Sequence, residues 1–188
     1  MRHVISALVM NEPGVLANVA NMFSARGFNI DSLVVGRTED PALSRMTIVV
    51  IADDNTLDQV RKQLSKLVPV VKVRDFKDTA YIERDLALLT IAVEPDQRSA
   101  VIEIVNLFRG KVVDVAPASL VIELAGTEEK IEAFIELMKP YGIRELARTG
   151  VIAMSRGVNT ERSEGGPSGP VPRKRSLDAP AAAALPPS

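Results

Sequence analysis

Two short segments contain the residues whose types and spacing could bind a small molecule. In the first, Asn11 is followed by Pro13 and Gly14, which open a helical pattern. The first backbone N–H groups of a helix have no partner within it, and they lie at the positive end of the helix dipole. Such donors suit a carboxylate, and a glycine at position 14 lets a ligand approach the backbone closely.

The second segment supplies another side-chain amide. Asn29 lies 18 residues after Asn11 and follows the glycine at position 27, which ends the helical pattern. The fold must bring the two asparagines to neighbouring positions, either in one chain or across a dimer. Backbone donors for a carboxylate, together with two amides, predict a receptor for a free amino acid. The local alternative is that Asn11 only caps the helix and Asn29 only stabilises a turn.

The rest of the sequence argues against catalysis and metal binding. His3 is the only histidine among 188 residues and there is no cysteine, so His3 has no histidine or cysteine partner for a metal site, and no convincing catalytic triad can be built around it. Capping explains the paired acids better than acid–base catalysis does, because they fall at expected turns or helix starts. These pairs are Glu39/Asp40, Asp53/Asp54 and Glu128/Glu129. We therefore expect no catalytic and no metal-binding residues.

Charge and hydropathy exclude two further classes of partner. The net charge is −1 with acids and bases interspersed, which argues against a nucleic-acid binder that relies on a basic face. No apolar run approaches the roughly 20 residues of a membrane helix, and no secretory signal pattern is present. We expect a soluble, cytoplasmic protein with no nucleic-acid or membrane partner.

The elements that must position these residues alternate between strand and helix. In residues 1–77 the periodicity predicts strands at 3–9, 30–35, 45–52 and 70–76, and helices at 14–26 and 56–67. The order βαββαβ is the ferredoxin-like arrangement. Residues 84–158 predict a second unit of similar design, with helices at 97–109 and 127–139 and strands at 84–93, 111–116, 119–124, 143–148 and 151–153. The expected fold class is α+β, with two tandem ferredoxin-like sandwiches joined by a short link.

The composition changes after the second unit. Residues 159–188 are rich in glycine, proline and alanine and cannot bury apolar surface, so we predict a disordered tail. The basic run Arg173-Lys174-Arg175 is most simply a solvated charge cluster, although a localisation signal or an anion-binding patch is the alternative.

Several motifs, taken in order, resemble those of one family. The Asn11-to-Leu16 segment and Arg-Gly-Phe-Asn-Ile-Asp-Ser-Leu at 26–33 resemble the ACT domain, the amino-acid-sensing module of biosynthetic enzymes. With Asp-Pro-Ala-Leu-Ser-Arg-Met-Thr-Ile at 40–48, Phe-Arg-Gly-Lys-Val-Val-Asp-Val at 108–115 and Ala-Arg-Thr-Gly-Val at 147–151, the match extends to the small regulatory subunit of acetolactate synthase. The resemblance covers residues 1–157.

This resemblance implies a protein that is not an enzyme by itself and carries no cofactor. Its partner would be the catalytic large subunit, which binds thiamine diphosphate, FAD and Mg²⁺. The small subunit would activate that partner and confer feedback inhibition by a branched-chain amino acid, valine first, with leucine and isoleucine left open. It would also form a homodimer through its ACT domains.

The resemblance also implies which residues bind the effector. The carboxylate would meet the backbone around Pro13 to Leu16, the ammonium would meet the asparagine oxygens and nearby strand carbonyls, and the apolar side chain would lie near Gly36. The expected set is Asn11, Pro13, Gly14, Val15, Leu16, Asn29, Ile30 and Gly36. Two other classes of protein are weaker alternatives: a free-standing ACT-type sensor or regulator, and a small enzyme on a ferredoxin-like scaffold.

Overall fold

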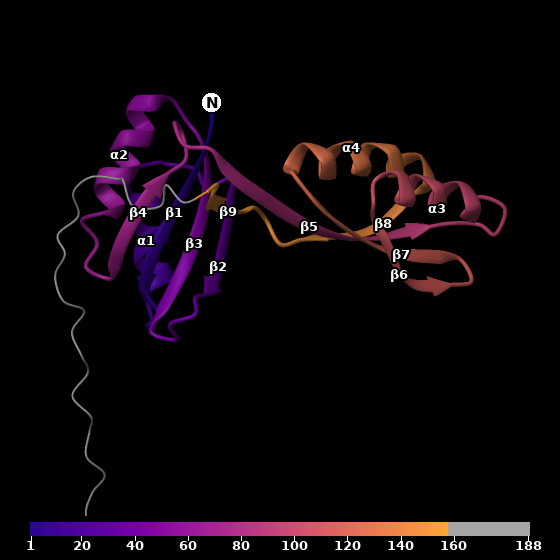
Figure 1. Cartoon of the computed structure of the whole chain (residues 1–188), viewed down its shortest axis with the longest axis horizontal. Coiled ribbons are helices and arrows are strands. Elements are labelled where there is room, and N and C mark those ends of the chain that lie inside the picture. The colour runs from indigo at the N-terminus through magenta and orange to yellow at the C-terminus, as the bar shows by residue number, and fades with distance from the viewer. Residues whose placement is uncertain (158–188) are drawn as a thin grey trace, which may run out of the picture.

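Two α+β units follow each other along the chain, and a long strand, β5 (Tyr81–Ala92), runs from one to the other (Figure 1). The structure is a computed structural model that describes residues 1–157. The predicted disordered tail, with Arg173-Lys174-Arg175, lies outside the described residues. No helix among the described residues is long and apolar enough to cross a membrane.

The first unit has the predicted βαββαβ order. Its elements are β1 (Arg2–Met10), α1 (Val15–Ala25), β2 (Ser32–Arg37), β3 (Leu43–Ile51), α2 (Asp54–Leu64) and β4 (Val70–Asp75). The antiparallel sheet has the strand order β2-β3-β1-β4, with β2 and β4 at its edges. Alternate residues of β1, namely Ile5, Ala7 and Val9, are fully buried against both helices, as the period-2 pattern of a half-covered strand requires.

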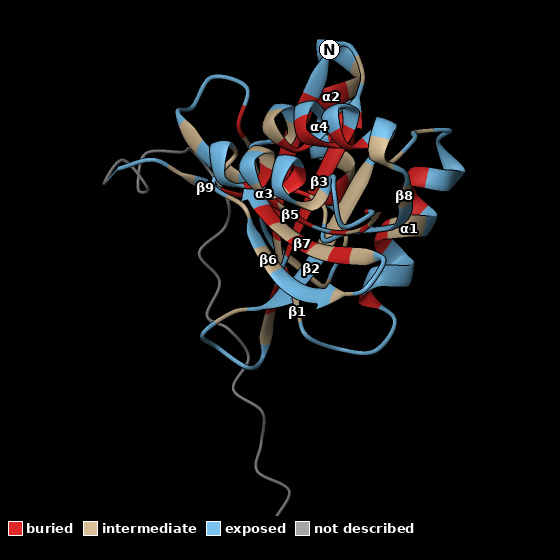
Figure 2. Cartoon of the chain, turned by 90° about the vertical axis from the view of Figure 1, so that its right-hand side faces the viewer, coloured by how far each residue is buried: buried red, intermediate tan, exposed pale blue. Residues whose placement is uncertain are grey.

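The second unit repeats this topology. After β5 come α3 (Arg98–Leu107), β6 (Lys111–Ala116), β7 (Ser119–Gly126), α4 (Glu128–Met138), a short 3₁₀ helix (Lys139–Tyr141) and β8 (Ile143–Arg148). The strand order is β6-β7-β5-β8, and a separate core forms where β5 and β7 meet α3 and α4 (Figure 2). The predicted fold class of two ferredoxin-like sandwiches is therefore confirmed.

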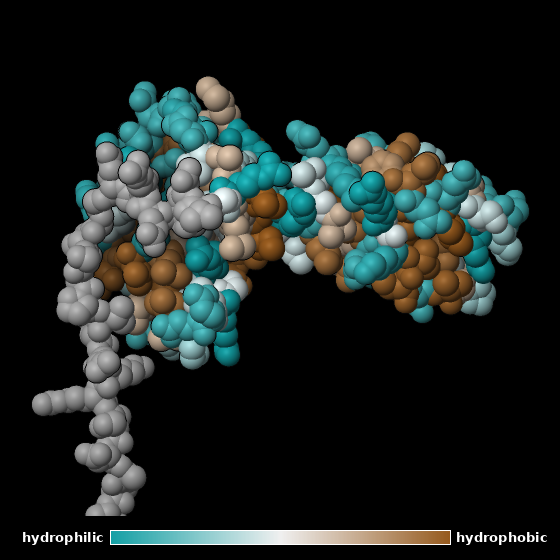
Figure 3. Space-filling view, viewed as in Figure 1, coloured by the Kyte–Doolittle hydropathy of each residue, from teal (hydrophilic) through white to brown (hydrophobic). Residues whose placement is uncertain are grey.

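The faces of the two sheets that lack helices differ in how they are covered. In the second sheet, Leu88 and Val113 remain 40% and 50% exposed, and Figure 3 shows apolar side chains gathered over β6 and β7. In the first sheet, Val4 and Val49 point away from the helices and are nevertheless buried. Another segment of the chain must therefore cover part of the first sheet.

That segment is the end of the second unit. We expect residues 151–153 to finish the second sheet, and β9 (Ile152–Ser155) does pair with residues 81–84 of β5, a strand of that sheet. The sequence did not predict that Val151 and Ala153 also pack on the first unit. Gly150, at φ +82, separates β9 from β8 by a left-handed backbone turn. The link expected between the units at 1–77 and 84–158 is shorter than this division implies, because β5 already begins at Tyr81.

Candidate functional site

The N-terminal end of α1 is open, as the sequence predicts. Gly14 precedes the helix at φ +85, and no side chain caps it. Within the described residues the N–H groups of Leu16 and Ala17 have no hydrogen-bond partner. Pro13, Gly14 and Leu16 are exposed, whereas Val15 is buried in the core. This end of α1 presents backbone donors and a positive dipole to solvent, which suits an anionic group.

Asn11 does not cap α1, so the local alternative for this residue is wrong. Its backbone N–H donates to the Ala42 carbonyl at 2.7 Å, and its side-chain Nδ2 donates to the Pro41 carbonyl at 2.9 Å. These bonds attach Asn11 to the turn between β2 and β3. Because Nδ2 is used, the Oδ1 oxygen of the amide remains available as an acceptor for a ligand.

One chain does not bring Asn11 and Asn29 together. Asn29 and Ile30 precede β2, whose first residue, Ser32, pairs with Val49. Asn11 lies beyond the opposite end of the sheet, where Arg37 closes β2. Arg37 lies five residue steps after Ser32, which is roughly 17 Å at the usual strand rise. The two asparagines are therefore at opposite ends of β2.

Gly36 lies at the same end of β2 as Asn11. It pairs with Arg45 on the inner side, while the outer side of β2 has no strand partner among the described residues. The pleat places Gly36 on the face away from α1, and the space where its side chain would be is open. Its neighbour Val35, 43% exposed, lies on the helix side of the same edge. The end of α1 and the edge of β2 thus form one accessible corner.

The other titratable residues singled out from the sequence have structural partners. The ring Nε2 of His3 lies 3.2 Å from the Ala52 carbonyl, and the ring is buried. Asp53 caps α2, and hydrogen bonds from Thr56 lower the pKa of its carboxyl. A hydrogen bond from Lys77 lowers the pKa of Asp54. No group of three or more metal-ligating side chains occurs in residues 1–157.

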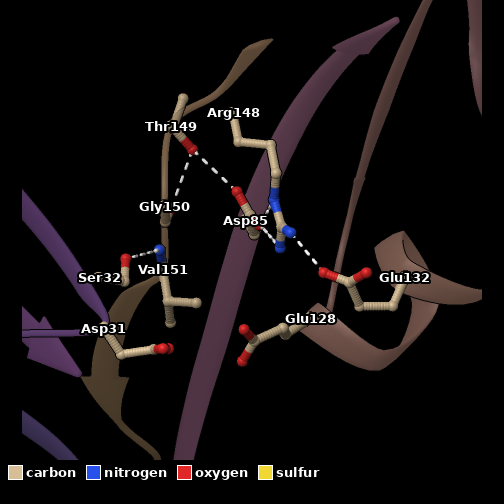
Figure 4. A pocket seen from close by; sticks show the side chains of 9 residues that line it. All are labelled: Asp31, Ser32, Asp85, Glu128, Glu132, Arg148, Thr149, Gly150 and Val151. Carbon is tan, nitrogen blue, oxygen red and sulfur yellow. Dashed lines mark hydrogen bonds and ion pairs between the residues drawn. The ribbon is translucent and has the colours of Figure 1, made fainter. Parts of the chain in front are cut away.

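A polar cavity between the two units was not predicted. Its volume is about 460 Å³ (Figure 4). Its lining comes from both units: Asp31, Ser32, Asp85, Glu128, Glu132, Arg148, Thr149, Gly150 and Val151. Arg148 donates to the fully buried carboxylate of Asp85 and to Glu132. Burial alone would lower the pKa of Arg148, but these hydrogen bonds outweigh it and raise that pKa.

The sequence contained a weak signal for this cavity. Arg148, Thr149 and Gly150 belong to the motif Ala-Arg-Thr-Gly-Val at 147–151, which contributes to the family resemblance. The structure pairs Arg148 within its own chain, to a residue 63 positions away. A single arginine in a strand does not reveal such a distant partner.

Comparisons with known proteins agree with this architecture. A family model described as "AHAS small subunit-like ACT domain" matches residues 5–72, and one described as "Small subunit of acetolactate synthase" matches residues 84–157. A probable acetolactate synthase small subunit from Methanothermobacter thermautotrophicus is 50% identical over 159 residues, covering 84% of this chain and 95% of that protein. The small subunit from Mycolicibacterium smegmatis is 51% identical over 155 residues, covering 82% and 91%.

A solved structure extends the match to three dimensions. The crystal structure of the acetolactate synthase small subunit from Thermotoga maritima aligns with a TM-score of 0.77 at 43% identity, covering 84% of this chain and 99% of that chain. Sequence and fold agree over both units, and the family predicted from the motifs is confirmed: the chain belongs to the family of acetolactate synthase small subunits.

Proposed function

We propose that this chain activates the catalytic subunit of acetolactate synthase and makes it sensitive to feedback inhibition by a branched-chain amino acid, with valine as the first candidate. The observation that carries the proposal is the open end of α1 at Gly14, beside the unpaired edge of β2. Family membership confirms the prediction that the chain is a non-catalytic subunit, with catalysis in the large subunit.

The effector site is built from two copies of the chain. Because Asn11 and Asn29 lie at opposite ends of β2, neither copy can supply both. If two β2 edges pair antiparallel about a two-fold axis, the start of one strand lies beside the end of the other. Asn29 and Ile30 of one copy then approach Asn11 and Gly36 of its partner, and two equivalent sites result.

Each polar group of a free amino acid finds a suitable partner at this corner. The carboxylate accepts from the N–H groups of Leu16 and Ala17, which have no other hydrogen-bond partner within the described residues. The ammonium donates to Oδ1 of Asn11 and to the amide of Asn29 from the partner copy. The exposed side chains of Val35 and Leu16 provide apolar contact for a branched aliphatic chain. Valine, leucine and isoleucine share this chemistry.

The catalytic large subunit is the macromolecular partner in this proposal, and it acts in the cytoplasm. Thiamine diphosphate, FAD and Mg²⁺ would be bound by that partner. The small subunit would contribute an equilibrium between two arrangements, of which the effector stabilises one. The coupling free energy between an effector site and a second, distant site is typically about 1–3 kcal/mol.

Calorimetric titration of the purified protein with valine, leucine and isoleucine tests the proposal. We expect saturable binding of at least one, lost in Asn29→Ala and kept in Asn55→Ala, an exposed asparagine in α2. Equal loss in both variants would show that the binding does not depend on this corner. Absence of binding by the parent protein, alone and with the catalytic subunit, would overturn the proposal.

A further inference from the structure

We propose that residues 148–151, called the joint below, transmit effector binding from the first unit to the second through their contact with Ser32. The inference rests on the proposed effector site, because Asn29 and Ile30 lie three and two residues before Ser32 in the same segment. It assigns a regulatory role to the lining of the cavity between the units.

The joint is attached to both units. On the side of the second unit, Arg148 and Thr149 bond to Asp85, whose carboxylate is inaccessible to solvent. The Thr149 N–H also donates to the Leu86 carbonyl at 3.0 Å. On the side of the first unit, Val151 is buried against Val4 and Val49. The joint therefore connects the two units in addition to β5, and a change in the angle between the units would act on these residues.

Ser32 contacts the joint directly. Its Oγ accepts a hydrogen bond from the Val151 N–H at 3.4 Å, as Figure 4 shows. A Cβ on Gly150 would lie 2.6 Å from that Oγ and 3.0 Å from Cγ2 of Val34. The backbone of the joint thus packs against the start of β2 with no room for a side chain. Because packed contacts of this kind are not continuously deformable, a displacement of β2 must move the joint.

Few other contacts hold the two units in one arrangement. Their main cores are separate, and in residues 1–157 one small apolar cluster around Val151, Ala153 and Phe76 bridges them, beside a hydrogen bond from Arg74 to Ser155. Arg2 adds ion pairs to Glu83 at 3.1 Å and Glu128 at 2.7 Å. An interface this small permits relative motion of domains without disturbing either core. The polar cavity beside the joint provides space for that motion.

Ser32→Ala in the holoenzyme, reconstituted from both subunits, tests the inference. The substitution removes the Oγ acceptor and leaves the backbone pairing of β2 intact. Ser119→Ala is the matched control, because Ser119 likewise begins a strand, β7 of the second unit. Calorimetry measures the affinity for valine, leucine and isoleucine, and initial rates measure activation and inhibition by the amino acid that binds.

We expect Ser32→Ala to bind the effector within about twofold of the parent and to activate the catalytic subunit normally. Inhibition at saturating effector should be largely lost, since coupling between sites is roughly 5- to 150-fold and its removal abolishes the response. Ser119→Ala should be inhibited like the parent. Normal inhibition of Ser32→Ala would overturn the inference, and so would loss of binding, since Ser32 would then belong to the effector site itself.

Hydrogen exchange provides a second measurement, whose result would not depend on the effector if Ser32 had only a structural role. In the parent holoenzyme the effector should change the exchange of the peptide that contains Val151, and Ser32→Ala should lose this change. An identical change in both proteins would refute transmission through Ser32. If the parent binds none of the three amino acids, the proposed function and this inference fail together, whereas failure confined to Ser32→Ala overturns the inference alone.

Discussion

Gly14 is the residue on which the proposed effector site depends most. It is the last residue before α1, its φ is +85, and a side chain added there would point into open space. The site therefore tolerates a larger residue sterically at the cost of backbone strain, and the charge of that residue decides whether a carboxylate can still bind.

Gly14→Asp should weaken effector binding at least about tenfold, which corresponds to about 1.4 kcal/mol, because its charge repels the effector carboxylate. Activation of the catalytic subunit should remain. Gly14→Asn is the control, since asparagine has a similar shape and tolerates a left-handed backbone without the charge. Calorimetry and inhibition assays measure both effects. Equal losses in the two variants would mean that the site does not recognise a carboxylate here.

Asp53 illustrates a different residue-scale role, the capping of α2. Its Oδ1 accepts from the Thr56 N–H at 2.7 Å, and hydrogen bonds from Thr56 lower the pKa of the carboxyl. A carboxyl whose pKa is lower in the folded state stabilises the protein above the unfolded-state pKa, and this stabilisation disappears as the pH falls through the folded-state pKa.

Asp53→Asn should therefore make the free energy of unfolding depend less on pH in the acidic range. Asparagine keeps a capping oxygen but does not titrate, so stability near pH 7 should change little, and the loss between pH 5 and pH 3 should be smaller than in the parent. Urea unfolding at several pH values measures this. A variant whose acid sensitivity matches the parent would contradict the assigned role of the carboxylate.

At the scale of elements, β9 is the strand that connects the two units. Gly150 makes a left-handed turn between β8 and β9, and after this turn Val151 and Ala153 pack on the first sheet. The turn lies directly against β2. A glycine is therefore favoured at position 150 for two reasons: the backbone has a positive φ, and the neighbouring strand leaves no space for a side chain.

A comparison of Gly150→Ala with Gly27→Ala separates the cost of a positive φ from the cost of close packing. Both glycines have positive φ, but only Gly150 has neighbours within 4 Å of an added Cβ. We expect Gly27→Ala to lower the free energy of unfolding by about 1–2 kcal/mol from backbone strain. Gly150→Ala should lose about 1–3 kcal/mol more from overpacking against Ser32 and Val34. Equal losses in urea unfolding would show that the packing of the joint on β2 is loose.

At the scale of the whole molecule, the two units share one topology, but their sheets differ in which faces and edges are covered. The first sheet has one helix-free face partly covered by β9 and an accessible edge at β2, whereas the second sheet leaves Leu88 and Val113 exposed on its helix-free face. The proposed dimer uses the β2 edge, where an unpaired strand is a ready template for pairing with a second copy.

Val35→Glu should weaken that dimer. A charge placed on the outer edge of β2 opposes strand pairing, so the dimer dissociation constant should rise and effector binding should fall with it. Val113→Glu, on the exposed edge strand of the second sheet, is the control. Sedimentation velocity at several protein concentrations measures the association. Dissociation caused only by Val113→Glu would place the interface on the second unit.

Local patterns in the sequence determined the elements, the open helix start at Gly14 and the family, because each depends on residues close together in the chain. The alternation of Ile5, Ala7 and Val9 and the Asp53 cap belong to this class, and the structure reproduces them. The ends of β6 and β8 match the prediction, and other strand ends differ by up to three residues, since the terminal residues of a strand depend on its neighbours. The ACT-type motif identified the corner where an effector is expected.

The tertiary structure alone decided how these parts meet. It placed Asn11 and Asn29 at opposite ends of β2, packed side chains of the last strand against the first unit and paired Arg148 with Asp85, 63 residues away. Periodicity tells which face of an element is buried but not which element covers it. That choice depends on shape and on buried polar partners that meet only when the chain has folded, which is why the joint at Gly150 could not be predicted from the sequence.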